Sequence, residues 1–248
     1  MGLVFDKEAA DIYRTWQKSR QGRAISSAMD SFISHLLEPR PGDRILDIGC
    51  GFGDNLQFLR SRHAVATGLD PSPHMLAVAA GRIGKSCTLV KGTAEDLPFE
   101  DNEFDSAMLI NTLEFLDDPE PAIREAARVS SRKIVLASIN KWSFGGAGNR
   151  LRALLGNRLF SRAEFYSLWK LRSLILKTCG PVSLSWAGIS APLPGGMERF
   201  FGIKEGIGRR PFSVIVGVSA GLAYTLRTDP LTIPVRLNSA LKKPLYTG

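Results

Sequence analysis

Three glycines at alternate positions, Gly49, Gly51 and Gly53, follow residues 45–48, which are apolar except for Asp47, and precede an expected helix. Glycine tolerates positive φ and lets a ligand lie directly against the main chain, facing the helix N-terminus. The spacing narrows the class of ligand. A dinucleotide fingerprint, G-x-G-x-x-G, would place its third glycine at position 54, which is Asp54. The turn therefore favours a ribosyl ligand without a pyrophosphate over a nicotinamide or flavin dinucleotide.

An acidic residue, Asp70, ends a second expected strand at residues 64–69. Pro71, Ser72 and Pro73 come next and form a helix start with a serine cap. At the end of the second strand of a dinucleotide-binding fold, a carboxylate can accept hydrogen bonds from both ribose hydroxyls. The alternative is a helix-capping role for Asp70, which Ser72 can already supply. We therefore assign Asp70 to ribose binding.

Polar residues also follow the third and fourth expected strands. The loop 92–99 comes after strand 88–91, and strand 106–110 leads into Asn111, Thr112 and Glu114. Because strand ends in open α/β sheets face the ligand crevice, we place Asn111 and Glu114 between a cofactor and an acceptor. The alternative for the loop is a solvated acidic segment. The alternation of strand and helix signals from residue 44 to 139 predicts a parallel sheet with helices on both faces.

Taken in order, these segments resemble the motifs of class I S-adenosylmethionine (SAM) dependent methyltransferases, in the UbiE-like, methyltransferase type 11 branch that acts on small molecules. The resemblance runs from residue 13 to about residue 218. It implies an α/β fold with a Rossmann-like, doubly wound sheet of seven strands, mostly parallel with an antiparallel last strand, plus a helical lid. The implied cofactor is SAM. The last three strands are expected at residues 134–138, 182–186 and 212–218.

The resemblance also implies which residues bind SAM. The loop 92–99 corresponds to the segment that recognises adenine, although Thr93 stands where relatives commonly have Asp. Tyr13 lies where an N-terminal tyrosine of related enzymes closes over the methionine part of the cofactor. Residues 130–133 replace the Pro-Gly-Gly turn of relatives and imply a different turn. The expected cofactor-binding residues are Asp47, Gly49, Cys50, Gly51, Phe52, Gly53, Asn55, Asp70, Pro71, Met75, Thr93, Ala94, Glu95, Asn111, Thr112, Glu114 and Tyr13.

Methyl transfer from a sulfonium is an in-line displacement, which needs alignment and exclusion of water more than it needs a base. Five side chains could serve as a base: His35, His74, Glu114, Tyr13 and Tyr166. Each has a packing or solvent-facing alternative, so we name no catalytic residue. The three cysteines are widely spaced: Cys50, Cys87 and Cys179. They predict neither a disulfide framework nor a metal site.

The length of 248 residues fits one domain with an appended lid. The expected divisions are an N-terminal helical cap at 1–43, a SAM-binding core at 44–139, a helical lid or acceptor insertion at 140–178, the final core strands at 179–218 and a basic tail at 219–248. Within the insertion, a helix is expected at residues 162–177. Residues 1–23 are dense with charge and lack the pattern of a signal peptide, so a cytoplasmic location is expected.

Charge is divided unevenly along the chain. Residues 1–140 hold 16 Lys and Arg against 20 Asp and Glu, a net charge of −4, whereas residues 141–248 hold 16 against 4, a net charge of +12. The excess of positive charge in the second half indicates contact with the acceptor, with a membrane surface or with RNA. The alternative is a basic face that only contacts solvent. Residues 211–226 carry no charge but are shorter than the roughly 20 residues of a bilayer span, so they predict a buried strand. Peripheral membrane contact is a secondary interpretation, supported by the nearby Arg236, Lys242 and Lys243.

The leading hypothesis is a SAM-dependent methyltransferase with a small-molecule acceptor. Two alternatives stay open: an RNA or protein methyltransferase, for which no RNA-binding module is visible, and a SAM-binding protein without catalysis. DNA is not expected as a partner, because the fourth strand is followed by neither an (Asn/Asp)-Pro-Pro-(Tyr/Phe) run nor a Pro-Cys nucleophile. Aromatic residues of the insertion either line an apolar or ring-bearing acceptor pocket or pack the lid on the sheet. These residues are Trp142, Phe144, Phe160, Phe165, Tyr166 and Trp169.

Overall fold

The computed structural model describes residues 4–18, 20–143, 163–190 and 206–222. One eight-stranded sheet, in the order β3-β2-β1-β4-β5-β8-β6-β7, runs through these parts of the chain. The strands are β1 (Arg44–Ile48), β2 (Val65–Asp70), β3 (Thr88–Lys91), β4 (Phe104–Ile110), β5 (Ser130–Ile139), β6 (Ser183–Ser190), β7 (Gly206–Gly208) and β8 (Ile215–Gly221). The first five are mutually parallel, so their carboxyl ends meet at one edge of the sheet.

The predicted fold class is confirmed, and its strand count was one short. Strand β8 lies between β5 and β6 and is antiparallel to both, which is the antiparallel last strand that was expected. The missed strand is β7, three residues that pair with β6 at the far edge. Its Gly-Ile-Gly sequence is too short and too rich in glycine to give a strand signal.

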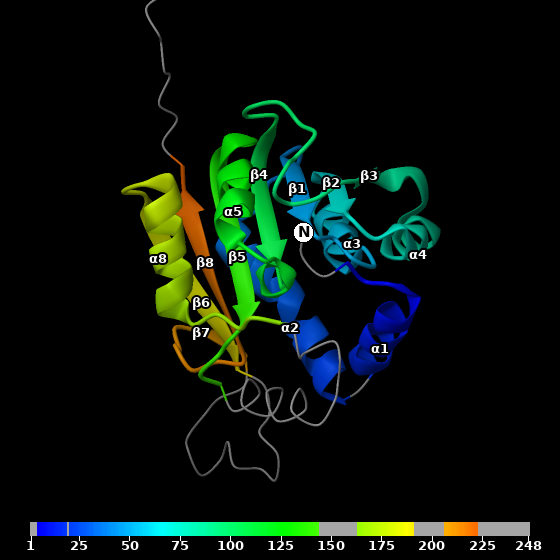
Figure 1. Ribbon diagram of the computed structural model, residues 1–248, viewed down its shortest axis with the longest axis horizontal. Helices are drawn as coiled ribbons and strands as arrows, with labels where there is room; N and C mark the ends of the chain where they lie inside the picture. The colour runs from blue at the N-terminus through cyan, green and yellow to red at the C-terminus, as the bar shows by residue number, and fades with distance from the viewer. Residues whose placement is uncertain (1–3, 19, 144–162, 191–205, 223–248) are drawn as a thin grey trace, which may run out of the picture.

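Helices cover both faces of the sheet (Figure 1). Helices α2 (Arg20–Leu37), α3 (Asp54–Ser61) and α4 (Pro73–Ile83) pack on one face, and α5 (Pro119–Arg128) and α8 (Leu168–Cys179) pack on the other. Helix α1 (Lys7–Gln17) contacts α2 and α4. Two short 3-10 helices, η1 (Gly84–Ser86) and η2 (Leu113–Phe115), complete the described elements.

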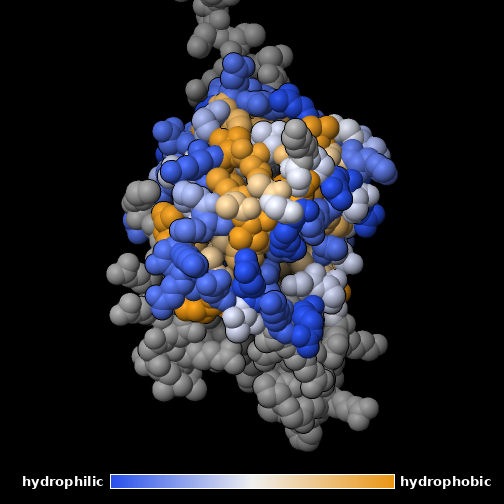
Figure 2. Space-filling model, turned by 90° about the vertical axis from the view of Figure 1, so that its right-hand side faces the viewer, coloured by the Kyte–Doolittle hydropathy of each residue, from blue (hydrophilic) through white to orange (hydrophobic). Residues whose placement is uncertain are grey.

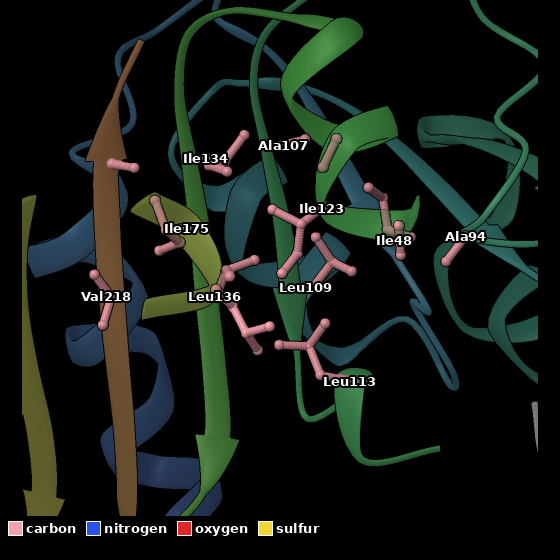
Figure 3. Close-up of a cluster of buried hydrophobic side chains, with 14 of the residues drawn as sticks. Ile48, Ala94, Ala107, Leu109, Leu113, Ile123, Ile134, Leu136, Ile175 and Val218 are labelled. Carbon is pink, nitrogen blue, oxygen red and sulfur yellow. The ribbon is translucent and has the colours of Figure 1, made fainter. Parts of the chain in front are cut away.

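The core divides into two apolar layers because neighbouring residues of a strand point to opposite faces. Leu46, Leu109 and Leu136 belong to the layer under α5 and α8, where Ile123 and Ile175 meet them. Figure 3 shows this layer, with Leu109 and Leu136 on adjacent strands and Ile123 beside them. The residues one position earlier, Ile45, Met108 and Val135, belong to the layer under α2 and α3. Complete burial of each such side chain contributes about 1.5–3 kcal/mol.

Two local expectations were wrong. The turn predicted at residues 130–133 is strand instead, because α5 ends at Arg128 and Val129 alone makes the turn into β5. The helix predicted from residue 162 begins at Leu168, where the Ser167 hydroxyl accepts the Lys170 N–H as an N-cap. The buried Tyr166 before it pairs with Asn140 as an isolated bridge.

The proposed division into segments has two boundaries that fall inside described elements. Helix α8 lies mostly within the segment expected as a lid, and it packs against α5 and β8 as part of the sheet-covering layer. Strand β8 continues to Gly221, three residues into the segment expected as a tail. The division itself stays a proposal.

The surface beside the edge strand β3 is partly apolar. On the side of the molecule where β3 and α4 lie, hydrophobic side chains reach the surface among charged ones (Figure 2). The half-buried Leu89 and Val90 belong to this short strand. Of the helices in the described ranges, none combines the length and the apolar character that a membrane crossing needs.

Candidate functional site

The glycine turn between β1 and α3 has the left-handed backbone that its spacing predicts. Gly49, Gly51 and Gly53 have φ values of 78°, 53° and 76°. A Cβ on Gly49 would lie 2.5 Å from the Thr112 side chain, so this glycine is required for close packing against the end of β4. A Cβ on Gly51 would meet nothing within 4 Å, so open space lies beside the turn at this position. A ligand can therefore approach the main chain of Gly51 without displacing protein atoms.

Asp70, at the carboxyl end of β2, is joined directly to that turn. Its Oδ2 accepts the Gly51 N–H at 2.9 Å and its Oδ1 accepts the Ser72 N–H at 2.8 Å. The side chain is 7% exposed; burial raises the pKa of Asp70, and the two N–H donors oppose that shift. The cap of α4 is Ser72, whose hydroxyl accepts the Met75 N–H. The Asp70 carboxylate thus lies beside Gly51 and orders the turn.

Asp47, near the end of β1, is a fully buried carboxyl group with an unused oxygen. Its Oδ2 accepts a hydrogen bond from the Asn55 side chain at 3.2 Å, whereas its Oδ1 has no protein partner. Burial raises the pKa of Asp47 to about 7. An unsatisfied buried acceptor costs about 1–3 kcal/mol, and a ligand with a cationic or N–H donor would remove that cost.

The end of β4 places three expected site residues in different roles. Asn111 has a positive φ of 54°, and its buried side-chain oxygen has no partner. Thr112 donates its hydroxyl to the Ile48 carbonyl at 2.9 Å and so ties the end of β4 to the end of β1. Glu114 is 1% exposed, and its Oε1 accepts the Ile139 N–H at 2.7 Å, which ties β4 to β5. Burial raises the pKa of Glu114 to about 7.

The expected adenine segment follows β3 and is held from α5. Thr93 bridges to Asp96, Ala94 is buried in the core and Glu95 is half-buried. Arg128 donates to the carbonyls of Leu97 and Phe99 and pairs with both oxygens of Glu125, and Glu125 Oε2 also accepts the Leu97 N–H. Sequence reasoning missed Arg128 and Glu125. Their i,i+3 spacing on one helix face was the available signal, but it is typical of surface ion pairs.

An N-terminal segment covers this edge of the sheet. The Phe5 carbonyl accepts the Ser72 hydroxyl, and the Phe5 ring meets the Phe115 ring edge-to-face at 4.9 Å. Behind it, Ala10 of α1 packs with the expected site residues Phe52 and Met75, which are 3% and 4% exposed. Phe5 therefore joins the ends of β2 and β4 across the site. No pattern in the sequence pointed to it.

Three further expected site residues have simpler positions. Cys50 is buried in the turn, where its N–H donates to the Leu69 carbonyl and burial raises the pKa of its thiol. Pro71 is half-buried between Asp70 and the cap of α4. Tyr13 lies on α1, and its side chain is outside the described structure.

The described candidate bases lie in different environments. His35 on α2 and His74 on α4 are exposed, whereas Tyr166 is 1% exposed in the core beneath α8. The Glu164 N–H donates to the Glu114 carbonyl at 2.9 Å, so this segment lies beside the end of β4. Within the described ranges, no group of three His, Cys, Asp or Glu side chains has the geometry of a metal site.

The aromatic residues expected around an acceptor separate into two groups. Phe165 and Tyr166 are 7% and 1% exposed, so they pack in the core. Trp142 and Trp169 are 61% and 53% exposed, so they face the surface. Phe144 and Phe160 lie outside the described residues.

Comparisons with known proteins show that the chain is similar to methyltransferases. Residues 46–135 match a family described as a methyltransferase domain. An uncharacterized protein of Methanocaldococcus jannaschii is 35% identical over 145 residues, which cover 58% of this chain and 64% of that protein. A demethylmenaquinone methyltransferase of Thermotoga maritima is 33% identical over 118 residues, which cover 45% of this chain and 51% of that enzyme.

A solved structure shares the fold over most of the chain. The SAM-dependent methyltransferase of Thermotoga maritima aligns with a TM-score of 0.71 at 23% identity, over 87% of this chain and 97% of its own. The matched segment covers only about half to two thirds of the two curated relatives. The residues that match the family, 46–135, include the glycine turn, Asp70 and the end of β4. Residues 46–135 of this chain therefore match a methyltransferase domain, and the described part of the chain shares the fold of a solved SAM-dependent methyltransferase.

Proposed function

We propose that this protein is a SAM-dependent methyltransferase that acts on a small-molecule acceptor. The observation that carries the proposal is the left-handed turn with open space at Gly51 beside the Asp70 carboxylate, inside the matched methyltransferase domain. This arrangement suits a ribosyl ligand held against the main chain.

The chain offers a distinct group to each part of SAM. Asp70 would accept the ribose hydroxyls through the lone pairs that Gly51 and Ser72 leave free. The unpartnered Asp47 Oδ1 would accept the ammonium group of the methionine part, which matches a buried anionic acceptor to a cationic donor. The Thr93, Ala94 and Glu95 segment, braced by Arg128, would flank the adenine.

Bound SAM supplies a methyl group on a positively charged sulfur, which an acceptor atom displaces in line. The protein has to hold the acceptor aligned and exclude water. Asn111, with its unpartnered side-chain oxygen at the end of β4, is placed to orient the acceptor, while Phe5 and Phe115 close the edge above the site. The other expected residues, Gly49, Cys50, Phe52, Gly53, Asn55, Pro71, Met75, Thr112, Glu114 and Tyr13, shape the turn and its cover in this proposal.

The acceptor that we propose is an apolar or ring-bearing molecule, reached in part by peripheral contact with a membrane. The name of the Thermotoga maritima relative, a demethylmenaquinone methyltransferase, supports an acceptor of that kind. The excess of positive charge after residue 140 supports contact with an anionic surface. A cytoplasmic location is part of the same proposal.

The first test is calorimetry with SAM and with S-adenosylhomocysteine, its demethylated product, using NAD as the control ligand. We expect micromolar binding of the first two and none of NAD. Binding of NAD without binding of SAM would contradict the cofactor assignment.

The second test asks for catalysis. Incubation of the protein with SAM and fractionated cell extract, followed by mass spectrometry, should yield a product heavier than its precursor by one CH₂ group. Binding of SAM without any product across the extract and an acceptor panel would favour a SAM-binding protein without catalysis. Transfer of label from SAM to RNA or protein fractions alone would favour a macromolecular acceptor.

A further inference from the structure

Three large aromatic side chains are exposed at one corner of the molecule. Trp142, Trp169 and Phe212 have exposed fractions of 61%, 53% and 64%. Single exposed apolar residues are common on protein surfaces, whereas a group of exposed aromatic rings marks an interaction surface. We name Trp142, Trp169 and Phe212 the aromatic rim.

The three residues come from three elements that hydrogen bonds hold together. The Trp169 and Phe212 rings have centroids 6.2 Å apart. The Asn140 side chain, at the end of β5, donates to the carbonyls of Pro211 and Ser213 at 2.7 and 2.9 Å, on either side of Phe212. Its oxygen accepts the Trp142 N–H at 3.1 Å. The buried amide of Asn140 therefore holds the backbone beside Trp142 and Phe212, and Trp169 contacts the Phe212 ring.

Exposed positive charges lie close to each residue of the aromatic rim in the sequence. Lys141 precedes Trp142, Lys170 follows Trp169, and Arg209 lies three residues before Phe212; all three cations are exposed. The described ranges after residue 140 contain six Lys and Arg residues and one acidic residue, Glu164. Aromatic rings next to lysine and arginine are the side chains that favour the interface between water and an anionic bilayer.

The aromatic rim lies on the same edge of the sheet as the proposed site. Trp142 follows the carboxyl end of β5, Trp169 lies in the first turn of α8, and Phe212 precedes β8, so these ends meet at the bottom of Figure 1. The glycine turn and Asp70 follow the carboxyl ends of β1 and β2 at that edge. The carboxyl edge of the sheet therefore carries both the aromatic rim and the proposed site.

We propose that the aromatic rim, with Lys141, Lys170 and Arg209, is a docking surface for an anionic lipid bilayer. Tryptophan and phenylalanine rings enter the interfacial region, and the three cations bind lipid headgroups. Resting on the proposed methyltransferase function, the docking surface gives the enzyme an acceptor that is dissolved in the bilayer. The docking itself depends only on the exposed rings and charges.

The test is co-sedimentation of the full chain with vesicles of phosphatidylcholine alone or mixed with phosphatidylglycerol. We expect binding to the mixed vesicles, weak binding to the neutral ones, and a blue shift of tryptophan emission on binding. The variants Trp142→Ser and Trp169→Ser/Phe212→Ser should each lose tenfold or more in vesicle affinity. The matched control is Val65→Ser, an apolar residue with an exposed fraction of 58% at the opposite edge of the sheet, which should bind like wild type.

Charge reversal tests the second half of the docking surface. Lys141→Glu/Lys170→Glu should lose the preference for phosphatidylglycerol, and added salt should weaken wild-type binding. Calorimetry with S-adenosylhomocysteine, expected within twofold of wild type for every variant, separates failure of docking from failure of the methyltransferase proposal. Equal vesicle binding by wild type and the aromatic variants would overturn the docking surface. Binding of single-stranded RNA but not of vesicles, lost in the same variants, would overturn it in favour of nucleic acid.

Discussion

At the scale of single residues, Asp70 has a structural role in addition to the ribose contact that its position predicts. Its two oxygens already order the glycine turn and the start of α4 through the N–H groups of Gly51 and Ser72. Substitution of Asp70 therefore removes support for the turn as well as the acceptor of the proposed ribose contact. The N–H groups of the turn and the proposed ribose hydroxyls can share the Asp70 carboxylate, because each oxygen has a second lone pair.

Asp70→Ala should weaken binding of S-adenosylhomocysteine by about tenfold to a hundredfold, since hydrogen bonds to a charged group contribute roughly 1.5–3 kcal/mol. It should also lower the melting temperature. Calorimetry and thermal unfolding measure the two effects. Asp105→Asn is the matched control, because Asp105 accepts the Arg44 N–H at 2.7 Å at the other end of β1. Equal ligand affinity in both variants would show that the site is misplaced.

Asp47 predicts a pH dependence of cofactor affinity. Burial raises its pKa to about 7, so a large fraction of the protein holds a neutral carboxyl group at pH 6. Ammonium binding requires the charged form, so affinity for SAM should rise several-fold from pH 6 to pH 8. Asp47→Asn should bind SAM weakly at both pH values, with no rise in affinity. Glu114→Gln should keep the rise. A flat profile in wild type would contradict the assignment of the ammonium to Asp47 Oδ1.

The same shifts set the sign of the pH dependence of stability. Asp47 and Glu114 both have pKa values of about 7 when folded and lower values when unfolded, so the folded protein binds more protons between pH 4 and 7. The free energy of unfolding should therefore fall as pH rises through this window, by on the order of 3 kcal/mol per group. Urea unfolding at pH 5 and pH 8 measures the fall. Asp47→Asn and Glu114→Gln should each reduce it, and an unchanged fall in both variants would exclude these carboxyl groups as its source.

Sequence reasoning located the polar residues around the turn because they occupy strand ends, where the fold brings them together. Gly51 and Asp70 are 19 positions apart in the chain and 2.9 Å apart through their hydrogen bond. Phe5 and Arg128 were not predicted, because their partners Ser72 and Leu97 are distant in sequence and no sequence pattern links them. What each site residue binds stays a prediction.

At the scale of elements, the packing of α2 on β8 depends on one glycine. A Cβ at Gly217 would lie 2.6 Å from the Phe32 ring and 2.7 Å from Leu36. The helix therefore lies unusually close to the last strand. Such contact leaves no room for a side chain, and overpacking in a core costs about 1–3 kcal/mol.

Gly217→Val should therefore lower the free energy of unfolding by about 1–3 kcal/mol or more. Gly81→Ala is the opposite case, because Gly81 lies in α4 and its Cβ would meet nothing within 4 Å. That substitution should raise stability by about 0.4–1 kcal/mol. Urea denaturation compares the two variants, and a neutral Gly217→Val would mean that α2 can withdraw from the sheet at little cost.

Most elements followed from alternating apolar residues and helix caps, whereas the boundaries of three did not. Strand β5 begins at Ser130 although Ser-Ser-Arg-Lys has weak strand preference, because its pairing with β4 determines the backbone. Strand β7 exists only through its partner β6. Helix α8 starts later than predicted because Tyr166 is extended and bridged to Asn140. Each deviation comes from a tertiary contact that local sequence does not encode.

At the scale of the whole molecule, the carboxyl edge of the sheet concentrates the functional features. Three features lie along this edge: the glycine turn, the N-terminal segment with Phe5 that covers it, and the aromatic rim. The two core layers hold the elements of this edge in place. The negative charge of residues 1–140 belongs to the cofactor half, and the positive charge of residues 141–248 belongs to the half that carries the rim. In our proposal, one edge therefore binds a cationic cofactor and an anionic membrane surface at different places.

The position of β8 has a consequence for how the chain is made. Strand β6 is synthesised before β8, but it pairs only with β7 and β8 among the described strands, and β5 meets β8 on its outer edge. During synthesis, β5 and β6 must therefore wait with unpaired edges until residues 215–221 emerge, and such edges invite aggregation.

A chain ended at residue 212 should thus be insoluble or bound to chaperones, although it contains the complete matched domain at residues 46–135. A chain ended at residue 222 keeps β8 and should fold. Comparison of the soluble fraction and the protease resistance of the two truncations measures the difference. Equal folding would mean that the five parallel strands fold without their antiparallel neighbour. Otherwise the ribosome must deliver residues 215–221 before β6 and β7 can join the sheet at β5.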